Sequence, residues 1–83
     1  KNKFIKIKKH FFSNLFKLIL LDLSNNQISS IDSSSFSDLS NLTNLDMSYN
    51  CIFRLEDNLF ENLKSLISLN LSFNFIKDFD QKS

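Results

Sequence analysis

The chain has 83 residues, a net charge of +1 and a hydrophobic content of 42%. A chain of this length forms at most one small domain. The absence of glycine excludes the glycine-rich loops that cradle phosphates and dinucleotides, and the single cysteine, Cys51, excludes an internal disulfide.

The segment 1–17 is basic, because it contains lysines and no acid: Lys1, Lys3, Lys6, Lys8, Lys9 and Lys17. Basic runs occur in nucleic-acid-binding segments and at anionic membrane surfaces. No arginine interleaves with these lysines, so we predict a solvated face and no nucleic-acid partner. No apolar run reaches the ~18–20 residues that span a bilayer, so this segment is not expected to insert into a membrane.

A 24-residue repeat follows the chain from Asn2 to Phe79 without insertion or deletion. Its first full copy, residues 18–41, has apolar residues at Leu18, Leu21, Leu23, Ile28, Ile31, Phe36 and Leu39. The second full copy, residues 42–65, has them at Leu42, Leu45, Met47, Ile52, Leu55, Phe60 and Leu63. Partial copies at residues 1–17 and 66–83 keep the spacing, with Phe4, Ile7, Phe12 and Leu15, and with Leu66, Leu69, Leu71, Ile76 and Phe79.

The Leu-x-Leu alternation in each repeat predicts a short strand with one buried face, because successive strand side chains point to opposite sides. One short strand cannot bury a core alone, so neighbouring repeats are expected to stack with their strands parallel. The inward-pointing pairs are predicted to be Leu21 and Leu23, Leu45 and Met47, and Leu69 and Leu71.

Two further columns are predicted from the repeat. Phe12, Phe36 and Phe60 are expected to stack on the returning half of each repeat. The asparagines that follow the strands are expected to hold the backbone of buried turns, because a carboxamide both donates and accepts hydrogen bonds. This asparagine ladder comprises Asn2, Asn26, Asn50 and Asn74.

The pattern L-x-x-L-x-L-x-x-N-x-I, followed by I/L-x-x-x-x-F-x-x-L, resembles the leucine-rich-repeat family. Its 24-residue length, with Ser24 and Ser72 after L-x-L, is similar to repeats of Toll-like receptor and Slit-like ectodomains. The resemblance implies an α/β right-handed solenoid, part of a horseshoe, with short parallel strands on the concave face and loops and short helical turns on the convex face. Neither end has a polar cap, so we expect exposed end faces and further repeats and caps in a longer parent chain.

In this family the exposed strand residues line the concave face, which is the usual contact surface. One column of that face holds Asp22, Asp46 and Asn70 in this chain. Two carboxylates on adjacent strands supply too few oxygens for calcium, so no metal is expected there.

Apolar residues that the repeat does not require gather just after the later strands. Tyr49 and Phe73 share one repeat position, Phe75 shares the position of Cys51, and Phe53 lies two residues after Cys51. Exposed aromatic clusters mark interfaces because they bury much area. Two interpretations stay open: a partner-binding patch of Tyr49, Phe53, Phe73 and Phe75, or rings that only stack between neighbouring repeats.

The triplets that begin at Asn41 and Asn70 match the N-glycosylation pattern, although such triplets also arise by chance in a chain rich in Asn and Ser. Asn41 falls on the returning side, where a glycan would cost little. A glycan on Asn70 would block part of the concave face.

No enzyme and no cofactor are predicted, because the lone His10 and the lone Cys51 have no partners at repeat-related positions. The leading hypothesis is a module that recognises a protein or another macromolecule, in the extracellular or cell-surface ectodomain of a membrane receptor. The alternatives are a cytoplasmic scaffold and a structural repeat protein of the extracellular matrix. The sequence does not identify the ligand.

Overall fold

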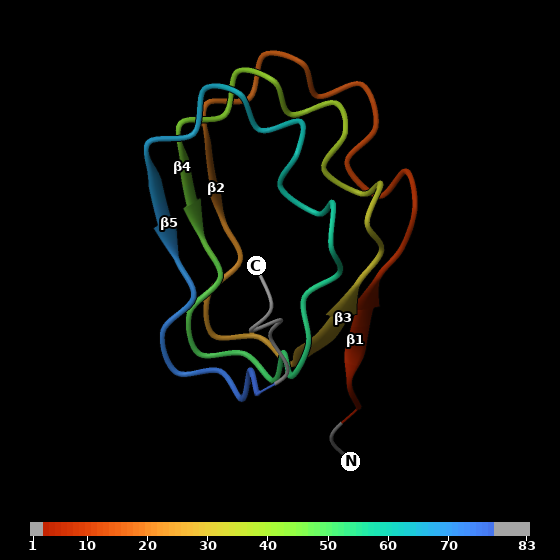
Figure 1. Cartoon of the computed structure of the whole chain (residues 1–83), viewed down its shortest axis with the longest axis vertical. Coiled ribbons are helices and arrows are strands. Elements are labelled where there is room, and N and C mark those ends of the chain that lie inside the picture. The colour runs from red at the N-terminus through yellow and green to blue at the C-terminus, as the bar shows by residue number, and fades with distance from the viewer. Residues whose placement is uncertain (1–2, 78–83) are drawn as a thin grey trace.

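The computed structural model describes residues 3–77. It contains the strands β1 (Ile5–Ile7), β2 (Leu20–Asp22), β3 (Ile28–Ile31), β4 (Asn44–Asp46) and β5 (Ser68–Asn70). Figure 1 shows the chain winding in successive coils, with β2, β4 and β5 along one side and β1 and β3 on another. We name these coil 1 (residues 3–17), coil 2 (18–41), coil 3 (42–65) and coil 4 (66–77).

The strands β2, β4 and β5 pair in parallel, and each is offset from the next by one whole repeat. Leu21 pairs with Leu45, and Leu45 pairs with Leu69. The pairing continues past the strands, since Leu23 N donates to the carbonyl of Asp46 at 2.7 Å. The predicted short parallel strands are therefore confirmed, and the length of the repeat sets their register.

A second parallel pair, β1 with β3, lies where the chain leaves the first sheet and was not predicted as strand. Ile7 pairs with Ile31, and Asp32 N donates to the carbonyl of Ile7 at 2.8 Å. The signal was present in the isoleucines at both ends of β3, because β-branched residues favour strands.

Within residues 3–77 the returning halves of the coils contain turns and no helix, so the predicted helical turns and the α component of the fold class are wrong for this part of the chain. Ser35 N donates to the carbonyl of Asp32 and Leu39 N to that of Phe36, which closes tight turns. Asp32 also accepts from Ser34 N and Oγ, and such local side-chain bonds compete with a helix. Accordingly, no described helix is long and apolar enough to cross a membrane.

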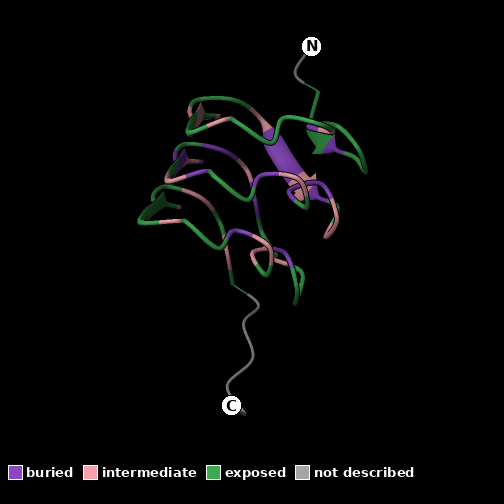
Figure 2. Cartoon of the chain, turned by 90° about the horizontal axis from the view of Figure 1, so that it is seen from above, coloured by how far each residue is buried: buried purple, intermediate pink, exposed green. Residues whose placement is uncertain are grey.

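Most of the buried residues belong to coils 2 and 3, as the burial colouring of the backbone shows (Figure 2), and Ile7 and Phe12 of coil 1 complete the core. The predicted phenylalanine column is confirmed: the ring centroid of Phe36 lies 5.9 Å from that of Phe12 and 6.4 Å from that of Phe60. Burial needs a neighbouring coil on each side, because Leu45 on the central strand is 1% exposed and Leu69 on the edge strand is 38% exposed. The repeat position at Phe79 lies outside the described residues.

Candidate recognition surface

Asn50 follows β4 and is buried. Its Nδ2 donates to the carbonyl of Leu23 in coil 2 at 3.0 Å, and to those of Met47 and Ser48 in its own coil. Its Oδ1 accepts from Ile28 N at 3.1 Å. One carboxamide therefore satisfies backbone groups of two coils and holds the turn that leads out of the sheet.

Asn74 has the same role one coil later, since its Nδ2 donates to the carbonyl of Met47 at 2.9 Å and its Oδ1 accepts from Ile52 N at 3.0 Å. Asn26 is more exposed and donates to the carbonyls of Leu23 and Ser24 within coil 2. Asn2 lies outside the described residues. These asparagines anchor the turn from which the candidate contact residues project.

A second set of turn contacts was missed at the sequence level. Oδ1 of Asp22 accepts from Ser24 N at 2.9 Å and from Ser24 Oγ at 2.6 Å. Oδ1 of Asp46 accepts in the same way from Ser48 N and Oγ. Asn70 accepts from the backbone N of Ser72. The signal was the Asp/Asn-x-Ser spacing, which is typical of a side chain that closes its own turn.

These turn contacts change the chemistry of the predicted concave column. The hydroxyl and then the backbone N–H of Ser24 stabilise the ionised carboxylate and hold the pKa of Asp22 below its ordinary value. One oxygen of each aspartate is engaged in its own turn, so the column offers a partner fewer acceptors than the sequence suggests. The predicted column of Asp22, Asp46 and Asn70 therefore also stabilises the turns that follow the strands.

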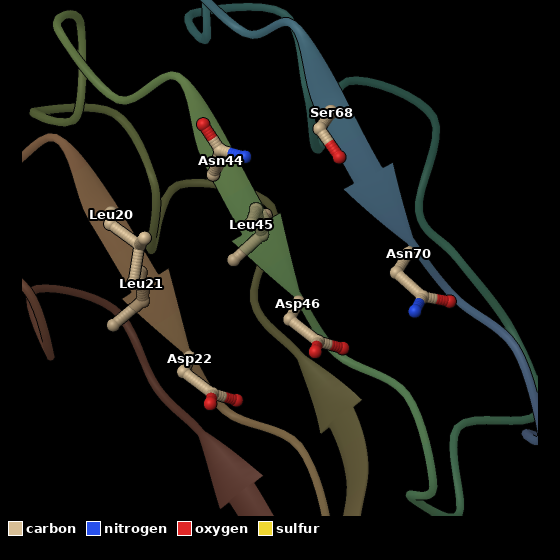
Figure 3. A pocket seen from close by; sticks show the side chains of 8 residues that line it. All are labelled: Leu20, Leu21, Asp22, Asn44, Leu45, Asp46, Ser68 and Asn70. Carbon is tan, nitrogen blue, oxygen red and sulfur yellow. The ribbon is translucent and has the colours of Figure 1, made fainter.

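The sheet of β2, β4 and β5 is hollowed between its strands (Figure 3). The hollow, of about 260 Å³, is lined by two rows of residues in register across β2, β4 and β5, and by Leu21 and Leu45 between these rows. One row is Leu20, Asn44 and Ser68, and the other is Asp22, Asp46 and Asn70. The structure thus brings the three predicted residues of the concave column onto one surface.

The backbone turns left-handed at one repeat position, with φ of 58° at Asn25, 57° at Tyr49 and 59° at Phe73. Asparagine adopts this conformation readily. A bulky residue does so at a cost of about 1–2 kcal/mol. Tyr49 and Phe73 are therefore placed where the fold itself favours asparagine, and the turn directs both side chains outward.

The rings of Tyr49 and Phe73 stack, with centroids 4.5 Å apart and planes inclined by 8°. The side chains nevertheless remain 51% and 68% exposed. The two interpretations from the sequence are thus not exclusive, because the rings pack on one another and still present a surface. Phe75 is also exposed, whereas Cys51, at the same repeat position, is half-buried.

Phe53 lies on a different surface. It lines a shallow hollow with Ser30, Ile31 and Arg54, on the side of the molecule that carries β3. Its side chain is exposed. The sequence predicts Phe53 in one group with Tyr49 and Phe73, and the chain bends at Tyr49 and Asn50 before it reaches residue 53.

The two glycosylation candidates differ in their surroundings. Asn41 is exposed, and its Nδ2, the atom that a glycan would modify, donates to the carbonyl of Phe16 at 2.9 Å. Asn70 uses Oδ1 in its turn with Ser72. In the described part of the chain, no group of three or more His, Cys, Asp or Glu residues is arranged to hold a metal ion.

Comparison with known protein families finds one family model that matches this chain. The family model described as "Leucine rich repeat" matches residues 1–52, more than half of the chain. No curated protein matches the sequence. The matched segment covers coils 1 and 2 and the first part of coil 3, including Asn26, Asn50 and Tyr49.

Proposed function

The chain belongs to the leucine-rich-repeat family, and from this premise we propose that it is a recognition module whose principal contact is the stacked pair Tyr49 and Phe73. Leucine-rich-repeat domains generally mediate protein–protein recognition. The observation that carries the proposal is an exposed aromatic pair held at a left-handed backbone position.

The backbone argument favours a role beyond stability. Coil 2 makes the same turn with Asn25, which adopts φ near 58° without the steric cost that Tyr and Phe bear. Strained backbone positions cluster at binding sites. Aromatic side chains supply large contact area with few rotatable bonds, and they are over-represented among residues that dominate binding energy.

The concave column and Phe75 extend this surface. Asp22, Asp46 and Asn70 line the hollow of the sheet, and the two rings lie on the turn that directly follows it. A partner that spans both would combine polar contacts on the sheet with apolar contacts on the rings. We propose no catalytic role and no cofactor for these residues.

We also propose that the coils form part of a curved, right-handed solenoid that continues in a longer parent chain. Ring spacing supports the curvature: equivalent rings are 4.5 Å apart beside the sheet and 5.9 and 6.4 Å apart on the returning side. Coils that fan out on the returning side bend with the sheet on the inside, as a horseshoe does.

For cellular context we propose the ectodomain of a cell-surface receptor. The resemblance to extracellular 24-residue repeats and the exposed Asn41 support this proposal. A cytoplasmic scaffold is the second candidate, favoured by the free thiol of Cys51, because unpaired thiols are common where disulfides do not persist. Glycan occupancy at Asn41 in a secretory host discriminates the two, and an unglycosylated secreted chain would weaken the receptor proposal.

The recognition proposal is tested with a random peptide library selected on the chain, followed by titration of an enriched peptide. Tyr49→Ala and Phe73→Ala are expected to weaken binding at least tenfold, as for residues at the centre of an interface. Phe16→Ala is the matched control, because Phe16 is an exposed ring on the returning side, away from the pair.

A different result would contradict the recognition proposal. If both alanine variants keep full affinity and lose only stability, the stacked pair serves the fold and the contact surface lies elsewhere. Titration of Asp22→Asn and Asp46→Asn then shows whether the concave hollow carries the binding instead.

A further inference from the structure

A column of exposed charged residues follows the coil stack on the side that carries β1 and β3. Each coil places charged or polar residues at the same two repeat positions, just after the strand or extended segment of that side. Coil 1 has Lys8 and Lys9, coil 2 has Asp32 and Ser33, and coil 3 has Glu56 and Asp57. We call Lys8, Lys9, Asp32, Glu56 and Asp57 the charged column.

The contacts between coils place these residues next to one another. The backbone N of Asp32 bonds to the carbonyl of Ile7, which precedes Lys8. Ser33 lines one shallow hollow together with Glu56 and Asp57, and with Arg54, the one cation among the described residues of that hollow. The bonds from the backbone N and then the hydroxyl of Ser34 lower the pKa of Asp32, and Coulomb attraction to Lys9 and His10 of coil 1 lowers it further by a smaller amount. The column is therefore continuous over three coils.

The sign of the charge reverses along the column, from positive in coil 1 to negative in coil 3. A uniformly acidic partner, an anionic membrane or a nucleic acid would be attracted by Lys8 and Lys9 and repelled by Glu56 and Asp57. A uniformly basic partner would meet the opposite conflict. A partner that complements both ends of the charged column carries acidic groups opposite Lys8 and Lys9 and basic groups opposite Glu56 and Asp57. A second copy of the chain in reverse orientation meets this condition.

We propose that this face binds a second copy of the chain in antiparallel orientation, about a two-fold axis that passes near Asp32. In such an isologous contact, residue i meets residue j and j meets i. Lys8 and Lys9 of each copy then face Glu56 and Asp57 of the other. A side-by-side parallel arrangement would instead set like charges against each other.

Apolar groups accompany the charges at the same two ends. Phe53 of coil 3 and Ile5 of coil 1 occupy equivalent repeat positions, and both are exposed. The two-fold operation brings Phe53 of one copy to Ile5 of the other, where the contact buries apolar surface. The net charge of +1 leaves little overall repulsion between copies.

Two like-charge encounters limit the strength of this contact. Lys6 of one copy approaches Arg54 of the other, which already has a partner within its own chain. Asp32 approaches its own symmetry mate. The dimer is therefore expected to be weak and sensitive to salt, since screening acts over about 8–10 Å at physiological ionic strength.

The test is a charge swap followed by sedimentation equilibrium of the full chain. Lys8→Glu with Lys9→Glu, and separately Glu56→Lys with Asp57→Lys, are each expected to weaken self-association by about tenfold, because each removes two surface pairs and their two symmetry mates. The combined four-residue swap restores opposite charges and is expected to return the dissociation constant to within about threefold of the wild-type value.

Asp32→Asn is the complementary variant. It keeps the Oδ1 acceptor for Ser34 and removes the charge near the axis, so it is expected to tighten the dimer about threefold. Far-UV circular dichroism checks that each variant folds, and Lys8→Gln with Lys9→Gln replaces a reversal that does not fold, with a smaller loss of association expected.

Three results would overturn the proposal. The first is a wild-type chain that stays monomeric at millimolar concentration and low salt. The second is self-association that neither pair of reversals changes, which would assign it to the exposed end coils. The third is a four-residue swap that stays as weak as the single-end reversals, because a self-complementary face must recover.

Discussion

The ring of Tyr49 lies parallel to the ring of Phe73 at 4.5 Å, although a whole repeat separates them in the chain. The distance is close to the spacing of adjacent strands, about 4.7–4.9 Å. Residues at one repeat position beside the sheet are therefore brought to stacking distance by the register alone. Whether a column stacks depends only on which side chains occupy that position.

The stack is expected to contribute a measurable coupling energy. In a double-mutant cycle of Tyr49→Ala and Phe73→Ala, the coupling free energy of unfolding should be about 0.5–1.5 kcal/mol, as for other aromatic pairs. Urea denaturation of the four chains measures it. Additive effects of the two substitutions would show that the rings lie side by side without stabilising one another.

The left-handed turn predicts an unusual substitution pattern at Asn25. Asn25→Ala should lower the free energy of unfolding by about 1–2 kcal/mol, because alanine is disfavoured at φ near 58°. Asn25→Gly, the matched control, should cost much less, since glycine adopts this conformation freely. Equal losses for both variants would mean that the asparagine side chain, and not the backbone, determines stability there.

The asparagine ladder predicts a graded response along the stack. Asn50→Ala removes the acceptor of Ile28 N in a buried turn and one of the two donors to the carbonyl of Leu23, which keeps Asn26, and this should cost roughly 2–4 kcal/mol. Asn26→Ala, in a more exposed turn, should cost about 1 kcal/mol or less. The comparison uses chemical denaturation at one pH, and a reversal of this order would contradict the ladder as described.

The serine contacts predict a pH effect. The pKa of Asp22 is depressed in the folded chain by Ser24, so its contribution to stability is present above the unfolded-state pKa of about 4 and is lost as the pH falls through the folded value. Ser24→Ala should raise the pKa of Asp22, measured by NMR titration of the carboxyl carbon. Ser72→Ala is the control, because its partner Asn70 does not titrate, and it should leave the pKa of Asp22 unchanged.

The phenylalanine column predicts the largest loss of stability among single core substitutions. Phe36 is fully buried between Phe12 and Phe60, so Phe36→Ala should cost about 3–5 kcal/mol. Phe36→Leu should cost less because it leaves a smaller cavity. Thermal unfolding followed by circular dichroism measures both, with Phe16→Ala as the exposed control, for which a change within about 0.5 kcal/mol is expected.

The periodic part of the fold could be predicted because it depends on burial, and burial follows from the spacing of apolar residues. Leu21, Leu45 and Leu69 were found from their equal spacing along the chain, and the structure pairs them in that register. The family resemblance was read from the same positions and is confirmed by the family match.

The non-periodic part could not be predicted in the same way. The turns of the returning side depend on Asp32, Ser34 and Ser35, whose side chains bond their own backbone, and hydrophobic spacing carries no information on such bonds. The left-handed backbone at Tyr49 was hidden because neither Tyr nor Phe indicates positive φ. The hollow that Phe53 lines with Ser30 and Ile31 could not be predicted either, because its linear proximity to Cys51 does not show the bend at Tyr49 and Asn50.

Each of β2, β4 and β5 is offset from the next by one whole repeat. The contacts between neighbouring coils therefore do not fix how many coils a chain of this kind contains. A duplicate of residues 18–41 inserted after residue 41 would present to coil 3 the same donors and acceptors that coil 2 presents now, and would receive from coil 2 those that coil 3 receives. Such a chain can gain whole coils by in-frame duplication, or lose them by in-frame deletion, while the contacts between neighbouring coils stay the same. What varies from module to module is then only the solvent-facing side chains, so the binding surface can change while the scaffold stays the same.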